Sequence, residues 1–444
     1  MRLSGWGQQP EVETRILPWR NPEDAARLVR RHTRLIPRGN GRAYGDAALS
    51  AAAVLQGLAG NRILELDLSQ GRLRCEAGLL LSDLLAVIIP RGWFVAATPG
   101  TRHVTLGGML AADVHGKNHH RDGGFADSVT DCTVVIADGS TVTISPTCHP
   151  DLFHATCGGM GLTGVIVELS CRLSPLPTAG ILQQTLVTDS LEATLDLFTQ
   201  QGHWPYSVAW IDCLARGPRL GRSVLFLGRH ATLEEVPPHR QNLQLSTPLR
   251  RERLAVPFHP PCWILNRWSL AAFNALYHAH GRRQGTEPVV VPLDGFFYPL
   301  DTLSHWNRLY GRRGFTQYQC VLPLEEARRG LRCLLDRTAR AGLGSFLAVL
   351  KQLGPASGGM LSFPRSGYTL ALDFPWTRAA LDLLNELDVI VRDHGGRLYL
   401  AKDARMTAEM FQAGYPHLDQ FREIKARVDP HNRFQSLQSA RLGL

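Results

Sequence analysis

The chain has 444 residues, enough for two domains and a large core, and its 44% hydrophobic and 20% charged residues are typical of a globular protein. Its nine cysteines include no C-x-x-C pair, so neither a zinc knuckle nor a disulfide framework is indicated, and a reducing compartment is expected. The N-terminus has no apolar core, and the longest apolar run, 78–90, is too short to cross a bilayer. We therefore expect a cytoplasmic protein without a signal peptide or transmembrane helix.

The net charge of +9 is the unusual global feature. Nucleic acid, an anionic lipid surface or a phosphorylated ligand would each explain it. The sequence contains no nucleic-acid motif and no continuous basic run, so no nucleic-acid partner is expected. An anionic ligand and simple solubility both remain open explanations.

The first third of the chain alternates helix and strand signals. The segment NPED, 21–24, combines an N-cap, an early proline and two acids, which predicts a helix through the following AARLVRR. Residues 64–69 and 72–78 alternate like half-buried strands, and 81–92 is typical of a helix closed by proline and glycine. Asp138-Gly139 predicts the turn of a hairpin, and 151–175 indicates a helix, a glycine turn and a strand. These signals indicate an α+β region of about 175 residues.

The pattern changes from about Thr178, where the glycine loops become rarer. Strands such as SVAWIDCLA and SVLFLG alternate there with long helical patterns. Leu324–Ala341 is amphipathic with acids at its start, and Ala379–His394 repeats that design before Gly395-Gly396. The segment 240–267 is rich in proline and arginine and indicates an irregular insertion.

Two glycine loops, 38–48 (RGNGRAYGDAA) and 98–120 (TPGTRHVTLGGMLAADVHGKNHH), combine glycine with small residues where a strand gives way to a turn or helix. Backbone N–H groups in such loops can approach a ligand closely, which suits a pyrophosphate. A third loop follows at Gly158–Gly161. The pattern is neither the usual dinucleotide G-x-G-x-x-G nor a P-loop, so a nicotinamide-type domain and a P-loop enzyme are both disfavoured.

The stretches RGNGRAYGD, ATPGTRHVTLGGMLAADVHGKNHH and GGMGLTG resemble the FAD-binding domain, of PCMH type, in the vanillyl-alcohol-oxidase family of flavoproteins. The stretches FFYPLDTLSHWNRLYGRRGFTQYQCVLP, LSFPRSGYTLALDFP and GGRLYLAKDARMTAEMFQAGYP extend the resemblance over nearly the whole chain, and it is weakest at 188–292. It implies a two-domain α+β fold. The expected parts are an FAD-binding domain at 1–178, a substrate domain on an antiparallel sheet at 179–396, and a segment at 397–444 that returns to the first domain.

The resemblance also implies which residues bind the cofactor. The first loop is expected along the diphosphate or the flavin, the second loop forms the other wall, and the third contacts the adenine side through its backbone. The residues concerned are Arg38, Gly39, Asn40, Gly41, Arg42, Ala43, Tyr44, Gly45, Asp46, Gly100, Thr105, Leu106, Gly107, Gly108, Ala112, Asp113, Val114, His115, Ile166 and Tyr399. Many relatives attach FAD through a histidine in the pattern R-x-x-G-H. Arginine occupies that position here and cannot form the bond, so non-covalent FAD is expected.

The stretch DVHGKNHH, 113–120, places three histidines within six residues and raises the question of a metal site. Glycine and asparagine within it are poor helix residues, and no carboxylate or cysteine has the usual companion spacing. We therefore expect no metal. A purely structural histidine cluster remains an alternative to a loop beside the flavin, in which His115 lies at the edge of the active site and Lys117, Asn118 and His119 hold the shape.

Oxidation of an alcohol by a flavin leaves negative charge on the ring, which a nearby cation stabilises. By the resemblance, Lys402 supplies that cation; the alternative is an exposed lysine paired with Asp403. Tyr44 and His115 are candidates to orient or deprotonate the substrate hydroxyl. Gln317 and Gln319, two apart on a strand, suit a polyol and Lys351 suits a phosphate, although each is also typical of the polar face of a strand. Two departures concern the substrate, because Phe297 and Ala371 stand where relatives have tyrosine and cysteine.

The resemblance implies FAD-dependent oxidation of a sugar hydroxyl to a ketone. The expected substrate is the 2′-hydroxyl of a polyprenylphosphoryl-β-D-ribose, and the reaction is then the first half of an epimerisation to the arabinose donor of cell-wall arabinan. The alternative is a soluble alditol or aldonolactone oxidase. A short-chain dehydrogenase/reductase is the expected partner. The insertion at 240–267 could attach the protein peripherally to the inner membrane surface, or it could be an ordinary solvated loop. Its basic and apolar residues are Arg250, Arg251, Arg253, Leu254, Val256, Phe258 and Trp263.

Overall fold

The computed structural model describes residues 1–243, 245, 254–260, 266–345 and 347–444. Its N-terminal part contains a parallel sheet with the order β3 (Arg15–Pro18), β5 (Ala53–Gln56) and β4 (Ile36–Arg38). It also contains an antiparallel sheet with the order β10 (Thr141–Ile144), β9 (Val129–Val135), β11 (Val165–Pro175), β7 (Arg72–Glu76) and β6 (Ile63–Asp67), in which β8 (Trp93–Val95) also pairs with β11. The helices of this part are α1 (Pro22–Arg31), α2 (Leu81–Ile88), α3 (Leu106–Ala111), α4 (His119–Asp122) and α5 (Pro150–Thr156).

Local sequence signals place several of these elements correctly. The side chain of Asn21 accepts a hydrogen bond from the Asp24 amide at 2.8 Å and caps α1, as predicted. Gly139 adopts φ +82° in the turn between β9 and β10, which confirms the predicted hairpin. Helix α2 passes into a short 3₁₀ turn and ends at Gly92 in the left-handed conformation, again as predicted.

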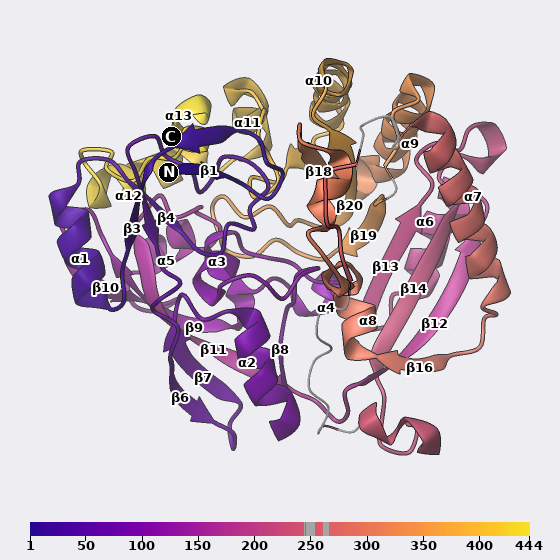
Figure 1. Cartoon of the computed structure of the whole chain (residues 1–444), viewed down its shortest axis with the longest axis horizontal. Coiled ribbons are helices and arrows are strands. Elements are labelled where there is room, and N and C mark those ends of the chain that lie inside the picture. The colour runs from indigo at the N-terminus through magenta and orange to yellow at the C-terminus, as the bar shows by residue number, and fades with distance from the viewer. Residues whose placement is uncertain (244, 246–253, 261–265, 346) are drawn as a thin grey trace.

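The second part is an eight-stranded antiparallel sheet. Its order is β16 (Val289–Pro292), β12 (Gly180–Thr188), β14 (Ser223–His230), β13 (Tyr206–Ile211), β19 (Val349–Leu353), β20 (Gly367–Pro375), β18 (Phe315–Pro323) and β21 (Arg397–Leu398). Figure 1 shows this sheet on the right and the N-terminal sheets on the left. The predicted α+β fold, with a second domain built on an antiparallel sheet, is confirmed.

The two faces of the large sheet have different cover. Helices α6 (Leu191–Gln200), α9 (Leu324–Ala341) and α10 (Arg378–Asp393) cover one face, where Tyr368 packs on Phe198. The other face carries the side chains of Gln319 and Ala371, which lie opposite each other on β18 and β20. Helix α7 (Arg267–Arg283) covers the far end of this second face and contacts β12 and β14. The part near β18 is thus left facing the N-terminal domain, which makes it the candidate floor of a site between them.

The C-terminal segment returns to the N-terminal sheets through α11 (Ala408–Gly414), α12 (Leu418–Val428) and α13 (Leu437–Leu442). Leu35 exchanges backbone hydrogen bonds with Arg433 and Gln435, and Phe434 is buried in the cluster beside α1. Figure 1 shows both ends of the chain in the part of the molecule that holds the N-terminal sheets. The first and last segments therefore share one core.

Only part of the expected insertion, 240–267, can be described. Arg250, Arg251, Arg253 and Trp263 lie outside the described residues. Leu254 and Ala255 form β15, which pairs in parallel with β17 (Leu303–Ser304). Leu254 and Phe258 are exposed, whereas Val256 is buried. No helix in the described ranges is both long and apolar enough to pass through a bilayer.

Candidate active site

The first two glycine loops meet at Gly39 and Thr105. A Cβ atom added to Gly39 would lie 2.2 Å from the Thr105 hydroxyl oxygen, so only glycine allows this approach. The same hydroxyl caps α3 by accepting a hydrogen bond from the Gly108 amide at 3.2 Å, and the Asn40 side chain donates to the His103 carbonyl at 2.8 Å. The two loops thus form one continuous wall.

The C-terminal segment closes the first loop from the other side. The Tyr44 amide donates to the Ala401 carbonyl at 2.9 Å, and a Cβ atom on Gly45 would lie 1.9 Å from the Asp403 carbonyl oxygen. The Arg441 guanidinium lies 2.8 Å from the Asp46 carboxylate and 2.9 Å from that of Asp403. Residues from both ends of the chain therefore fix the shape of this loop.

The start of the first loop is held by its own arginines. Arg38 donates to the carbonyls of Ala48 and Ser4, and Gly41 packs against its guanidinium. The Arg42 guanidinium lies over the Trp6 ring, 4.1 Å from its centroid. The Ala43 carbonyl accepts a hydrogen bond from the Trp6 amide at 2.8 Å. Contacts within the protein therefore hold this loop in place without a ligand.

The third loop packs behind the second. The amides of Gly158 and Met160 donate to the carbonyls of Leu110 and Ala111, the last two residues of α3. The amides of Leu106 and Gly107 donate in turn to the segment after β7. Ile166 lies on β11 opposite Val134, with its side chain buried. Ile166 thus lies within the N-terminal antiparallel sheet.

The stretch DVHGKNHH connects the two domains through hydrogen bonds. Gly354, just after β19, donates its amide to His119 Nδ1 at 3.1 Å, and His120 Nε2 donates to the Trp204 carbonyl at 3.0 Å. Asn118 donates to the Ala96 carbonyl at 2.7 Å. Within the described part of the chain, no three His, Cys, Asp or Glu side chains gather in a way that could hold a metal ion. The histidines at 119 and 120 instead serve separate hydrogen bonds.

Asp113 and Val114 begin this stretch. Asp113 is fully buried at φ +38°, and its carboxylate accepts hydrogen bonds from the Ala126 amide at 3.1 Å and the Ser357 hydroxyl at 2.5 Å. Burial raises the pKa of this carboxyl above its ordinary value. The Val114 carbonyl accepts from the Phe125 amide at 2.9 Å. The turn that aims His115 is therefore fixed by buried hydrogen bonds.

His115 lies between the second loop and the sheet. Its Nε2 atom is 3.0 Å from the amide nitrogen of Gln319, and its ring packs against Phe363 and Tyr399. The Tyr399 hydroxyl donates to the Ala112 carbonyl at 2.9 Å. Burial lowers the pKa of the His115 imidazole well below its ordinary value, so the ring is neutral at neutral pH. Its Nδ1 atom is buried without a hydrogen-bond partner among the described residues.

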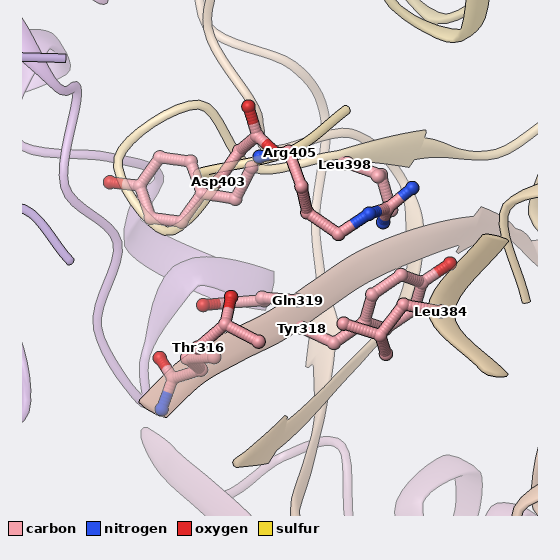
Figure 2. Close-up of a pocket in the computed structure, with 9 residues that line it drawn as sticks. Thr316, Tyr318, Gln319, Leu384, Leu398, Asp403 and Arg405 are labelled. Carbon is pink, nitrogen blue, oxygen red and sulfur yellow. The ribbon is translucent and has the colours of Figure 1, made fainter. Parts of the chain in front are cut away.

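The strand register brings the predicted polar residues to one face. Gln317 and Gln319 lie opposite Asp373 and Ala371, and Lys351 on β19 lies opposite Thr369 on β20. Gln319 also donates to the Thr369 hydroxyl at 3.1 Å. Figure 2 shows Gln319 and Tyr318 leaving β18 on opposite sides, as the alternation of a strand requires. The two glutamines predicted to share a face therefore do so.

Lys402 points into the same region. Its ammonium nitrogen lies 3.6 Å from the centroid of the Tyr44 ring, and it forms no ion pair within 4 Å among the described residues. Asp403, the partner in the alternative interpretation, is paired with Arg441 instead. Burial lowers the pKa of Lys402, and the negative charge of Asp373 opposes that shift.

Asp373 is a site residue that sequence reasoning missed. It is fully buried, and its carboxylate accepts hydrogen bonds from Gln317 at 2.6 Å and from the Tyr310 hydroxyl at 3.4 Å. Burial raises the pKa of this carboxyl, and Lys402 opposes the rise. The sequence contained one signal for this residue: an aspartate within the otherwise apolar strand GYTLALDFP, where a buried carboxylate requires polar partners.

Two further lysines line this region with different surroundings. Lys351 has no hydrogen-bond partner among the described residues, and burial lowers its pKa to about 8. Lys117 donates to the Phe296 carbonyl and lies 4.2 Å from the centroid of the Phe296 ring; burial and Lys351 lower its pKa to about 7. Phe297, on α8 (Leu293–Phe297), is only 1% exposed and packs on Phe94 and Tyr206. Phe297 thus lies in an aromatic cluster, with the Lys117 ammonium 5.9 Å from the centroid of its ring.

The region between the loops and the sheet fits a large polar cofactor. A Cβ atom on Gly100 would meet nothing within 4 Å, and one on Gly108 would meet only the Thr105 hydroxyl. The buried Nδ1 of His115 and the ammonium of Lys351 have no hydrogen-bond partners in the described structure. Glycine-lined walls with unused donors around them are what a dinucleotide with a polar ring requires.

Comparison with known proteins decides the family. Decaprenylphosphoryl-β-D-ribose oxidase of Mycolicibacterium smegmatis is 36% identical over 455 aligned residues, which cover all of this chain and 97% of the relative. The chain belongs to the decaprenylphosphoryl-β-D-ribose oxidase family. The family model described as an FAD binding domain matches residues 20–145, so FAD is the cofactor of this chain, as expected. The chain is an FAD-dependent oxidoreductase that acts on a CH–OH group.

Other relatives cover less of the chain. An uncharacterised protein of Streptomyces coelicolor is 37% identical over 82% of this chain and 100% of its own length. Cytokinin dehydrogenase 1 of Oryza sativa subsp. japonica is 31% identical over 35% of this chain and 32% of its own. A family model described as D-arabinono-1,4-lactone oxidase matches residues 374–441. The similarity to the oxidase of M. smegmatis therefore extends over the whole chain, whereas the similarity to the plant enzyme covers about a third of it.

Proposed function

We propose that the chain oxidises the 2′-hydroxyl of a polyprenylphosphoryl-β-D-ribose to a ketone, as the first half of an epimerisation to an arabinose donor for cell-wall arabinan. The observation that carries the proposal is the full-length similarity to a relative named for decaprenylphosphoryl-β-D-ribose. The sheet face supports it, because Gln317 and Gln319 offer neutral donors and acceptors for a sugar and Lys351 offers a cation for a phosphate.

FAD is proposed to bind without a covalent bond. The position at which relatives carry the attaching histidine is Arg42, which stacks on Trp6. The backbone of the loops containing Gly39 and Gly108 would hold the diphosphate, and Lys402 with Tyr44 would lie beside the ring. When bound, FAD supplies the acceptor for the hydride that leaves the carbinol carbon.

The chain's own residues supply the charge and the proton handling. The ammonium of Lys402 stabilises negative charge in the site, and Asp373 helps keep that ammonium protonated. Burial raises the pKa of Tyr44 well above its ordinary value, so its phenol stays protonated and acts as a donor. As the structure has it, the Gln319 amide donates to His115 Nε2, which places the ring proton on Nδ1 and makes His115 a donor that orients the hydroxyl. Turning that amide over would free the Nδ1 lone pair to act as the base.

The product defines the expected partners. A ketone at C2′ is a hydride acceptor, so we propose that a short-chain dehydrogenase/reductase reduces it with inverted stereochemistry. A substrate with a polyprenyl chain resides in a bilayer, so we also propose peripheral membrane association.

A soluble aldonolactone or alditol oxidase is the second candidate function. The match of residues 374–441 to D-arabinono-1,4-lactone oxidase favours it. This candidate gives Lys351 no anionic group to bind, whereas the lipid-phosphate candidate does. The two candidates therefore differ in what the cation on β19 is for.

Anaerobic mixing of the holoenzyme with different sugars tests the proposal. We expect polyprenylphosphoryl ribose to bleach the visible flavin absorbance and to give a product lighter by two hydrogens, whereas free ribose, alditols and aldonolactones react far more slowly. Bleaching by an aldonolactone at the rate seen with the lipid-linked sugar would contradict the proposal. Lys402→Met serves as the site control, because a variant reduced as fast as the parent would remove the role assigned to this lysine.

A further inference from the structure

Helix α7 presents an apolar line to the outside of the molecule. Its buried side, which includes Leu270 and His278, packs against the large sheet. Trp268 and Leu276 are 75% and 72% exposed and lie with the exposed Ala272 and Ala279 along the opposite side of the helix. Figure 1 shows α7 at the right-hand rim of the molecule. The part of this helix that points farthest into the surroundings is therefore hydrophobic.

The charges of α7 are all of one sign. Its 17 residues contain no aspartate or glutamate, and arginines lie at both ends, at Arg267, Arg282 and Arg283. Arg282 is paired with Asp189 outside the helix. A helix that faces water usually carries polar residues on its outer side. The apolar outer side of α7 is the reverse of that arrangement.

We propose that α7 lies in the surface of an anionic lipid bilayer, with Trp268 and Leu276 among the acyl chains and the terminal arginines at the headgroups. Interfacial helices combine a tryptophan- and leucine-bearing side with arginine and bind anionic lipid through both. The net charge of +9 acts in the same direction. This inference rests on the proposed function in one respect, since a bilayer is where a polyprenyl-linked substrate resides.

The same features disfavour a second copy of the chain as the occupant. In a two-fold dimer the helix would pair with itself, either parallel or antiparallel. In both arrangements an arginine-bearing end meets another arginine-bearing end, since Arg267 and Arg283 lie at opposite termini and no acid lies between them. Anionic headgroups complement both ends at once.

Vesicle flotation of the holoenzyme tests the proposal. We expect binding to vesicles of phosphatidylcholine with one third phosphatidylglycerol, weaker binding in high salt, and little binding to phosphatidylcholine alone. Leu276→Asp should weaken the binding at least tenfold. Leu233→Asp is the matched control, because Leu233 is a leucine of similar exposure on a turn elsewhere, and it should bind like the parent.

Three outcomes would overturn the proposal: no binding by the parent, equal binding by Leu276→Asp and the parent, or a parent dimer that this variant splits in analytical ultracentrifugation. Flavin content checks that each variant is folded. Reduction by detergent-dispersed polyprenylphosphoryl ribose needs no bilayer, and we expect Leu276→Asp to retain the parent rate there. A parent that binds vesicles but is not reduced in detergent would refute the proposed function and leave the docking surface standing.

Discussion

Replacing Arg441 by methionine tests how far helix α13 maintains the first glycine loop, 38–48. The guanidinium bridges Asp46 and Asp403, whose side chains are only 5% and 3% exposed. Methionine leaves both carboxylates buried without their cation, and removing one partner of a buried ion pair costs about 3–5 kcal/mol. Unfolding entropy of about 2.1 cal/mol/K per residue gives roughly 0.9 kcal/mol/K for a cooperative chain of 444 residues, so Tm should fall by about 3–5 °C.

The assay follows unfolding by circular dichroism and FAD release by flavin fluorescence in the same temperature ramp. Because Asp46 belongs to the first glycine loop, FAD should leave the variant at a lower temperature than it leaves the parent. Arg422→Met is the matched control, since Arg422 and Asp419 form an exposed pair expected to contribute less than about 1 kcal/mol. The reasoning is refuted if Arg441→Met melts within a degree of this control and releases FAD with it.

Three further substitutions test the loops and the sheet face. Gly39→Ala should separate the two loops and lower the flavin-to-protein ratio severalfold, whereas Gly295→Ala, where an added Cβ meets nothing within 4 Å, should not; equal flavin contents would count against the loop contact. Asp373→Asn removes the negative charge that favours protonated Lys402, so the rate of flavin reduction should fall about tenfold or more. The rate should also begin to decline at a lower pH than in the parent, because Lys402 loses its proton at a lower pH. An unchanged pH profile in stopped-flow measurements would exclude this role. The Lys351 ammonium loses its proton as pH rises through about 8, so kcat/KM for the lipid-phosphate substrate should fall there in the parent but stay low and flat in Lys351→Met. Because the pKa of Lys351 in the folded state lies below the unfolded value of 10.5, the parent becomes more stable as the pH rises from about 8 to 10.5. Lys351→Met should therefore have a higher Tm than the parent at pH 7, and this difference in Tm should shrink as the pH rises through that range. A difference in Tm that does not depend on pH would contradict the shift.

The elements that the sequence predicted well depend on interactions between near neighbours. The Asn21 cap reaches three residues along the chain, and the turn at Gly139 needs only its own backbone angle. Helix α9 begins and ends where its apolar periodicity does, at Leu324 and Ala341. The alternation of Gln317 and Gln319 likewise follows from strand geometry alone.

The residues that escaped prediction derive their meaning from distant partners. Arg441 is 395 residues from Asp46 and 38 from Asp403, so no local pattern marks it as a partner of the first glycine loop. Asp373 has an apolar sequence around it, and only the register of β18 against β20 brings Gln317 to it. The hydrogen bond from Gly354 to His119 spans 235 residues and similarly depends on the assembled fold.

The closure of the first loop by Ala401, Asp403 and Arg441 has a consequence for biosynthesis. During synthesis the first glycine loop is made long before Arg441, which follows Asp46 by 395 residues. The loop therefore lacks these contacts until Arg441 has been made and has folded back onto it. We expect FAD to bind only after this segment has folded, so that riboflavin shortage leads to a cofactor-free protein.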